Sequence, residues 1–257
     1  METISVTLTD IAKMIDHSLL HPTKTDSDLV EGCALAKKLD LASVCIKPYE
    51  TKAARELLHD SDVMVCAVIG FPHGNSATSV KVFETQTAVQ DGAEEIDMVV
   101  NIGKVIGGDW DYVSAEIDAI NQATVTGNAI LKVIFETDFL EVHHIKRLCE
   151  ICSEIGVRFV KTSTGYGMVK QTNGMYSYVG ATMEHLQVMR DNVSNEVQIK
   201  ASGGVRTLDE VLTVRSLGVT RIGATASEAI LEDAKNRGIS DKEPKQLTFK
   251  YGLSNKK

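Results

Sequence analysis

The sequence predicts an α/β fold, a single (β/α)8 TIM barrel, and three observations support this prediction. The chain has 257 residues, which is a common length for a barrel of this kind. Short apolar segments alternate along it with longer amphipathic segments, as in parallel strands that are joined by helical crossovers. Eight candidate strands can be counted in this alternation. An open, doubly wound sheet is the alternative, but no glycine-rich fingerprint follows the first strands.

The first half of the chain begins with a helix and then alternates between strands and helices. Thr9 or Asp10 is placed to cap a helix over residues 11–15, and Pro22 ends the strand that follows. Residues 63–69 are continuously apolar, as expected for a strand that is buried on both faces. The predicted strands here are residues 15–20, 42–46, 63–69 and 95–100, and the predicted helices are residues 26–38, 51–58 and 80–90.

The second half continues the alternation, with one interruption. Residues 168–179 form a polar, glycine-containing connection, which indicates a flexible lid or an exposed insertion. No linker or domain boundary is evident, so we expect residues 1–257 to form one domain with a possible loop insertion at 168–179. The predicted strands are residues 129–135, 159–161, 197–200 and 220–223, and the predicted helices are residues 110–123, 140–155, 181–189, 208–217 and 227–237.

The composition excludes several classes of function. The net charge is −8 and the one basic run is the terminal Lys256–Lys257, which argues against binding to nucleic acid or to an anionic membrane. No stretch approaches the roughly 18 apolar residues of a membrane span, and the N-terminus lacks the form of a signal peptide. The five cysteines are an odd number, which favours reduced thiols over a disulfide framework. We therefore expect a cytoplasmic protein.

Two lysines stand at the ends of short buried strands. Lys161 follows Phe159 and Val160, and Lys200 recurs in a similar setting 39 residues later. Small hydroxyl residues and glycines follow both lysines. Burial opposes the charge of an ammonium group, and two lysines that face one cavity lower each other's pKa by like-charge repulsion. This pattern predicts a Schiff-base aldolase with Lys161 as the nucleophile.

Other polar residues also lie in the predicted strands. Because side chains alternate along a strand, Glu95 and Asp97 share one face, and this face should point into the barrel. Asp16, Cys45 and Lys132 occupy similar positions in their strands. The alternative is a buried salt-bridge layer, and for Lys132 the two interpretations are equally favoured.

Two glycine loops indicate a phosphate site, whereas no metal site is predicted. Gly203–Gly204 and Gly223–Thr225 follow the last two strands, where barrels often hold a phosphate on backbone N–H groups. Ordinary turn glycines are the alternative. Cys149 and Cys152, which follow two histidines, are interpreted as core residues because both lie on one face of a helix. A divalent-metal aldolase is disfavoured, since no cluster of histidine and carboxylate ligands falls at successive strand ends.

Seven segments of the chain resemble deoxyribose-phosphate aldolase, and they occur in the order of that family from about residue 10 to residue 230. The segments that carry Lys161 and Lys200 are the most specific. The resembling segments are residues 14–20, 43–46, 70–74, 95–101, 131–137, 159–165 and 200–206.

This resemblance implies a class I aldolase that cleaves 2-deoxy-D-ribose 5-phosphate to acetaldehyde and D-glyceraldehyde 3-phosphate in deoxyribonucleoside catabolism. It implies a homodimer or a higher homo-oligomer that needs no metal or organic cofactor. Lys161 would form the imine, Lys200 would perturb its pKa and relay a proton, and Asp97 would transfer a proton, through a water. The implied substrate-binding residues are Asp16, Cys45, Lys132, Thr162, Gly165, Gly203, Gly204, Gly223 and Thr225.

The sequence departs from the family in two places. Most members cross from the lysine strand to the next helix in a short loop, whereas this chain has the additional residues 168–179. Some members end in a tyrosine that assists proton transfer, and here Tyr176, Tyr178 and Tyr251 are the candidates for that role. The alternatives are a lysine-imine aldolase with a different sugar-phosphate or aldehyde substrate, and a non-catalytic sugar-phosphate-binding protein.

Overall fold

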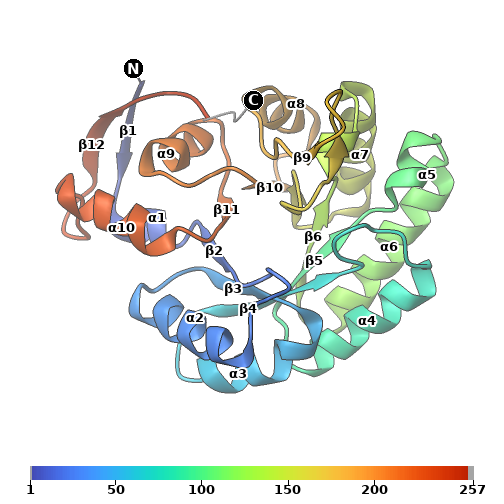
Figure 1. Ribbon diagram of the computed structural model, residues 1–257, viewed down its shortest axis with the longest axis horizontal. Coiled ribbons are helices and arrows are strands. Elements are labelled where there is room, and N and C mark those ends of the chain that lie inside the picture. The colour runs from blue at the N-terminus through green and yellow to red at the C-terminus, as the bar shows by residue number, and fades with distance from the viewer. Residues whose placement is uncertain (1, 254–257) are drawn as a thin grey trace.

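The computed structural model describes residues 2–253 and contains the predicted closed barrel of eight parallel strands. The strands lie at the centre of the molecule and the helices surround them (Figure 1). Going round the barrel, the order is β10, β11, β2, β3, β4, β5, β6 and β7, and the barrel closes where its last strand in the chain, β11, pairs with its first, β2. The bounds are β2 Ile15–Ser18, β3 Ser43–Ile46, β4 Met64–Ile69, β5 Glu95–Val99, β6 Ile130–Ile134, β7 Phe159–Lys161, β10 Gln198–Ser202 and β11 Arg221–Ala224.

The helices cover the outside of the barrel and bury one face each. Helix α7 is an example, because Ile145, Leu148, Cys149 and Cys152 recur at helical spacing and are all fully buried. None of the helices within residues 2–253 is long and apolar enough to cross a membrane. The helices are α1 Leu8–Ala12, α2 Asp26–Lys38, α3 Thr51–Leu58, α4 Thr78–Gln90, α5 Ile102–Ile106, α6 Trp110–Thr126, α7 Val142–Ile155, α8 Met183–Asn192, α9 Leu208–Ser216 and α10 Ser227–Asn236, with the short 3-10 turns η1 Pro48–Glu50 and η2 Thr137–Phe139.

Six of the barrel strands, all except β3 and β4, carry buried or largely buried charged residues that pair with one another inside the barrel. In β5, Ile96 and Met98 belong to the main hydrophobic core, whereas the alternate residues Glu95 and Asp97 make buried ion pairs. The register between strands then aligns the charged residues. Lys200 is the direct partner of Lys161, and Lys132 is the direct partner of Asp97. The predicted inward orientation of these strand faces therefore agrees with the structure.

Four elements near the ends of the chain or between strands, α1, β1, β12 and α5, were not predicted correctly. The first helix is Leu8–Ala12 rather than residues 11–15, because Thr7 caps it by accepting a hydrogen bond from the Asp10 amide. A two-stranded antiparallel sheet joins β1 Glu2–Val6 to β12 Lys245–Phe249. Its two strands lie far apart in the sequence, so neither shows a local turn signal. Helix α5 is a single short turn and carries little periodicity.

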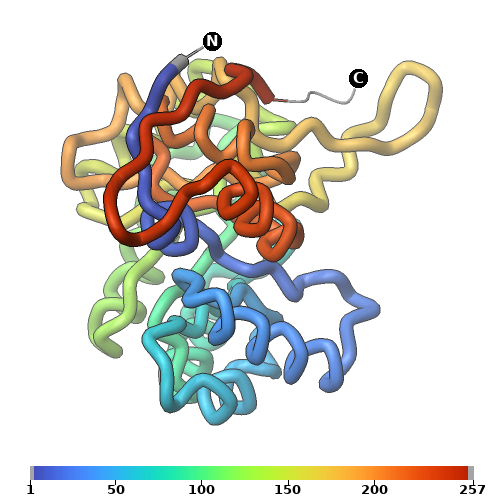
Figure 2. Tube along the Cα trace, turned by 90° about the vertical axis from the view of Figure 1, so that its left-hand side faces the viewer, coloured from blue at the N-terminus to red at the C-terminus, as the bar shows by residue number. Residues whose placement is uncertain are grey.

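The insertion at residues 168–179 contains a small exposed hairpin. Strands β8 Val169–Lys170 and β9 Tyr176–Ser177 pair in antiparallel fashion, and the gold segment that projects at the upper right of Figure 2 contains them. Met175 and Tyr176 are well exposed on it. The hairpin is tied to the barrel by Asp138, which accepts hydrogen bonds from the Val179 and Gly180 amides. The expected exposure of this segment therefore agrees with the structure, whereas its being an insertion relative to the family stays a prediction.

A buried ion pair anchors the end of β5, the strand that carries Asp97. Lys81 of α4 donates to Glu116 of α6 at 2.9 Å and to the carbonyl oxygen of Val99 at 2.8 Å. Glu116 also accepts a hydrogen bond from the Asn101 amide. Burial lowers the pKa of Lys81 and raises that of Glu116, against the attraction between the two groups. The pair therefore fixes the geometry at a cost in desolvation.

We predict that the two members of this pair are strongly coupled. Lys81→Met leaves the Glu116 carboxylate buried without its cation, which should lower the free energy of unfolding by about 3–5 kcal/mol. Adding Glu116→Leu should cost less than the sum of the two single changes, by roughly 1 kcal/mol or more. Urea unfolding measures all three variants, with the exposed Lys52→Ala as a control that should change little. Strictly additive effects would contradict the coupling.

Candidate active site

The candidate active site is a cavity of about 340 Å³ where β2, β3, β7, β10 and β11 end. This is the face on which barrels of this type carry their chemistry. Additional wall residues are His21 and Tyr166, which the sequence did not indicate, and Ser202 and Arg206, which flank the predicted Gly203–Gly204 loop. Of the residues predicted from the sequence, those that line the cavity are Cys45, Lys161, Gly165, Lys200, Gly203, Gly204, Gly223 and Thr225.

The predicted Asp97 does not line the cavity, and its carboxylate lies directly behind the charged floor that Lys161 and Lys200 form. Lys161 Nζ and Lys200 Nζ both lie 2.7 Å from the same oxygen, Oδ2. The two lysine nitrogens are therefore within about 5.4 Å of each other. Lys132 Nζ lies 2.9 Å from the other oxygen, Oδ1. The structure thus brings the two predicted lysines and the predicted acid into direct contact.

Behind the lysines lies a buried layer of ion pairs. Lys200 and Arg221 both pair with Asp16, while Lys132 and Arg221 both pair with Glu95. Lys132 and Asp16, which were predicted to bind substrate, belong to this layer and do not line the cavity. The charged groups of both residues are paired within this layer, which agrees with the alternative interpretation of Lys132 as part of a buried salt-bridge layer.

Thr162 was also predicted to bind substrate, but its side chain is not part of the cavity wall. Its hydroxyl donates to the Ser202 carbonyl and accepts from the Ser202 amide, each at 3.0 Å. These two bonds join the ends of β7 and β10. Thr162 therefore fixes the spacing of the strands that carry Lys161 and Lys200.

Electrostatics keep most of the network ionised. Burial opposes the charge of Asp97, but Lys132, Lys161 and Lys200 outweigh it and hold the pKa of Asp97 well below its usual value. Burial likewise opposes the charge of Lys200, yet Asp16 and Asp97 raise its pKa above the usual value. Asp97 is thus a carboxylate and Lys200 an ammonium group in the unliganded site.

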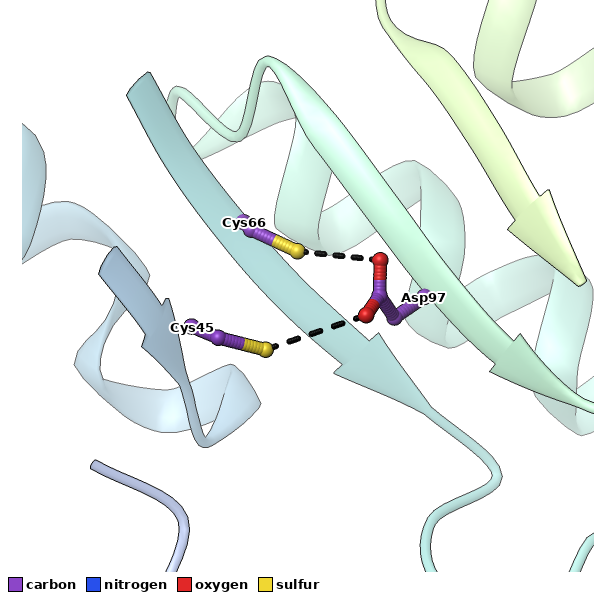
Figure 3. Close-up of side chains that lie close together, drawn as sticks. All are labelled: Cys45, Cys66 and Asp97. Carbon is purple, nitrogen blue, oxygen red and sulfur yellow. Dashed lines mark hydrogen bonds between the residues drawn. The ribbon is translucent and has the colours of Figure 1, made fainter. Parts of the chain in front are cut away.

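Two thiols complete the surroundings of Asp97. Cys66 Sγ lies 3.1 Å from Oδ1 and Cys45 Sγ lies 3.8 Å from Oδ2, and Figure 3 shows both side chains pointing at the carboxylate. Lys132 Nζ lies 3.2 Å from Cys66 Sγ. Within residues 2–253, this trio is the group whose donor atoms lie close enough together to hold a metal ion. Cys66 was not singled out from the sequence, where it is one apolar residue in an apolar run.

Another part of the cavity wall is built from glycine loops. Gly203 and Gly204 have φ angles of +80° and +101°, which a residue with a side chain rarely adopts. A Cβ atom on Gly203 would also meet the Gly180 backbone at 2.9 Å. These loops, together with Arg206, leave backbone N–H groups and a cation near the cavity. Such a wall suits an anionic group.

The inserted hairpin contributes to the cavity wall. Met168 and Tyr178 line it, and the same two residues also line an adjoining outer pocket with Tyr176. Tyr251 is 39% exposed and does not belong to either wall. Among the tyrosines considered for proton transfer, Tyr178 is therefore the one that the structure brings to the cavity.

Glu136 is a buried carboxylate that the sequence did not mark as functional. It adopts a left-handed conformation with φ of 57° and is 1% exposed. Its oxygens accept hydrogen bonds from the amide and the hydroxyl of Thr164. Burial raises the pKa of Glu136 to about 7, with Asp138 adding to the rise and Thr164 and Lys161 opposing it. Glu136 thereby holds the loop that follows Lys161.

This shift predicts a pH dependence of stability that Glu136→Gln should remove. The folded protein binds the proton of Glu136 more tightly than the unfolded chain, so the stability from this group is complete below pH 4.5 and is lost as the pH rises through 7. Between these values the wild type should lose about 3 kcal/mol relative to Glu136→Gln. Urea unfolding over this pH range measures the difference. Parallel curves for the two proteins would contradict the assignment.

Known sequences match most of this chain. Residues 11–228 match the family described as DeoC/LacD family aldolase. A deoxyribose-phosphate aldolase from Rhodopirellula baltica is 46% identical over 228 residues, which cover 89% of this chain and 90% of the relative. One from Treponema denticola is 43% identical over 222 residues, which cover 86% of this chain and 98% of the relative.

Solved structures give the same result. An aldolase designated QR15 matches with a TM-score of 0.81 at 35% identity, over 89% of this chain and 97% of that one. The tetrameric deoxyribose phosphate aldolase from Aeropyrum pernix matches with a TM-score of 0.80 at 26% identity, over 90% and 93% of the two chains. From its sequence and its barrel, the chain belongs to the DeoC/LacD family of aldolases.

Proposed function

We propose that this protein is a deoxyribose-phosphate aldolase that cleaves 2-deoxy-D-ribose 5-phosphate through an imine on Lys161. The observation that carries the proposal is the sharing of one Asp97 oxygen by Lys161 and Lys200, each at 2.7 Å, at the floor of the cavity. Imine chemistry needs an uncharged amine beside a proton donor and acceptor. The arrangement supplies all three groups.

The charge balance of the network favours one uncharged lysine. Within residues 2–253, four cations meet here, namely Lys132, Lys161, Lys200 and Arg221, against the carboxylates of Asp16, Glu95 and Asp97. One buried positive charge is therefore in excess, which is costly at low dielectric.

Lys161 has the fewest ionic partners of the four cations. Among the described residues it pairs with one carboxylate, Asp97, whereas each of the other three cations pairs with two or more. It also lines the cavity, where an aldehyde can reach it. Lys161 is therefore the nucleophile that the geometry supports best.

The bond-forming step uses this amine directly. Lys161 Nζ attacks the aldehyde carbon of the open-chain sugar, and the resulting carbinolamine loses water to give a protonated imine. The imine remains beside Asp97, which has held the lysine nitrogen at 2.7 Å, so the new positive charge has a partner already in place. The imine then acts as an electron sink for the carbon–carbon bond.

Cleavage requires a proton to leave the 3-hydroxyl of the sugar. Asp97 receives it through a water, while the C2–C3 bond breaks and its electrons form an enamine on Lys161. D-glyceraldehyde 3-phosphate leaves, and Lys200, whose ammonium shares the Asp97 oxygen, relays a proton toward C2. Hydrolysis of the second imine releases acetaldehyde and restores the amine.

The phosphate end of the substrate fits the wall that the glycine loops form. The loops of Gly203–Gly204 and Gly223–Thr225 carry backbone N–H groups at the cavity, and Arg206 adds a cation. Met168 and Tyr178 of the insertion close this end. The hairpin therefore influences which phosphorylated aldehydes enter, and a related sugar phosphate is the alternative substrate.

The cellular location and the oligomeric state are part of the same proposal. The five cysteines are free and buried, which supports a reducing, cytoplasmic location. A homo-oligomer is supported by the tetrameric relative from Aeropyrum pernix. The substrate is a small sugar phosphate, and the reaction derived above uses protein side chains and water.

Two lysine substitutions test the mechanism. Lys161→Ala should lower kcat for deoxyribose 5-phosphate cleavage by roughly a thousandfold or more, since it removes the nucleophile. Lys200→Leu removes the ammonium group that shares the Asp97 oxygen with Lys161 and relays the proton, so kcat should fall by roughly a hundredfold or more. Steady-state kinetics over a pH series measure both effects.

The exposed Lys52→Ala serves as a control and should retain the activity of the wild type. An active Lys161→Ala variant would show that the nucleophile is wrongly assigned. A wild-type protein that binds deoxyribose 5-phosphate without turnover would instead favour the sugar-phosphate-binding alternative.

A further inference from the structure

Three donor atoms meet at the back of the cavity floor, and the reaction leaves two of them without a chemical role. Cys45, Cys66 and Asp97 come from the neighbouring strands β3, β4 and β5, and their sulfur and oxygen atoms all lie within 4.8 Å of one another (Figure 3). We propose that these three residues bind a thiophilic divalent cation, with Zn²⁺ as the reference ion, and that its binding switches the enzyme off.

The spacing fits a tetrahedral ion. With metal–sulfur bonds of about 2.3 Å and metal–oxygen bonds of about 2.0 Å, tetrahedral geometry sets donor atoms roughly 3.5–3.8 Å apart. Cys66 Sγ and Cys45 Sγ lie 3.1 and 3.8 Å from the Asp97 oxygens that they face. Cys45 and Cys66 are direct partners in the strand register. Small rotations of the side chains are therefore enough to bring the three donor atoms to tetrahedral spacing. A water from the cavity supplies the fourth donor.

The charge balance also favours binding. Each thiol releases its proton when it becomes a metal ligand, so two positive charges leave as the divalent ion brings two. The net charge of the buried network is unchanged. Lys132, at 3.2 Å from Cys66 Sγ, is in place to stabilise the thiolate. An isolated cation at this depth lacks such compensation.

The ion can reach the site from the cavity side. Cys45 lines the cavity, whereas Cys66 and Asp97 lie directly behind it and are fully buried. Once bound, the ion draws on the Asp97 oxygens that otherwise hold Lys161 and Lys200. This consequence for turnover rests on the proposed function, whereas binding of the ion does not.

A second pair of thiols in the chain provides a matched comparison. Cys149 and Cys152 lie on one face of α7, and both are buried in the main hydrophobic core. Neither lines the cavity. Substitution of Cys149 removes one thiol, as substitution of Cys66 does, but it leaves the trio of Cys45, Cys66 and Asp97 intact.

The test uses Co²⁺ as a spectroscopic probe and Zn²⁺ as an inhibitor of the full-length protein. Wild type and Cys149→Ala should each bind one Co²⁺ with sulfur-to-cobalt charge-transfer absorption. Cys66→Ala should lose that absorption, and its Zn²⁺ affinity should fall by more than the roughly 10- to 100-fold that loss of an outer partner costs. Circular dichroism establishes that each variant is folded, and Cys45→Ala replaces Cys66→Ala if the latter is not.

Inhibition is measured relative to the metal-free activity of each variant. Zn²⁺ should inhibit wild type and Cys149→Ala reversibly, with recovery on addition of EDTA, and should inhibit Cys66→Ala only at much higher concentration. Absence of charge-transfer absorption in the folded wild type, or its loss in Cys149→Ala instead of Cys66→Ala, would overturn the site. If cobalt binds but zinc does not inhibit, the metal site stands and its proposed effect on turnover is refuted. If the wild type binds cobalt but has no aldolase activity, only the proposed function is refuted.

Discussion

The buried carboxylate of Asp97 is the group on which the architecture of this site depends. It accepts hydrogen bonds from Lys132, Lys161 and Lys200, none of which is more than 2% exposed. Without it, three ammonium groups would face one another at low dielectric, and each unpaired buried charge costs several kcal/mol. A closed barrel satisfies this constraint because its register sets Asp97 beside Lys132 and Lys161 beside Lys200.

The surrounding structure serves to hold this cluster in one geometry. Lys81 and Glu116 tie two outer helices to the end of β5, just beyond Asp97. On the far side of Lys161, Glu136 binds Thr164 from a strained backbone conformation. Burial raises the pKa of both Glu116 and Glu136. Each interaction therefore fixes the geometry of the site at a cost in stability. Such a cost in stability is typical of functional sites.

The part of this arrangement that could be predicted from the sequence is the part that follows from local periodicity. Alternation within β5 predicts that Glu95 and Asp97 point inward, and the motifs around Lys161 and Lys200 identify both lysines as cavity residues. Arg221 was missed as an ion-pair partner and Cys66 as a neighbour of Asp97, because both contacts arise only when the barrel closes in a particular register. The β1–β12 sheet was missed for the same reason, since its pairing is entirely non-local. The sequence offered one signal for the role of Arg221, because it is a charged residue within a short strand.

The central claim is that Lys161 forms an imine, and reductive trapping tests it most directly. The protein is incubated with acetaldehyde, reduced with borohydride and digested, and the modified peptide is identified by mass spectrometry. Formation of the imine on Lys161 predicts a two-carbon adduct on that residue, and none when Lys161→Ala is treated in the same way. An adduct on Lys200, or no adduct in protein that is folded, would contradict the mechanism.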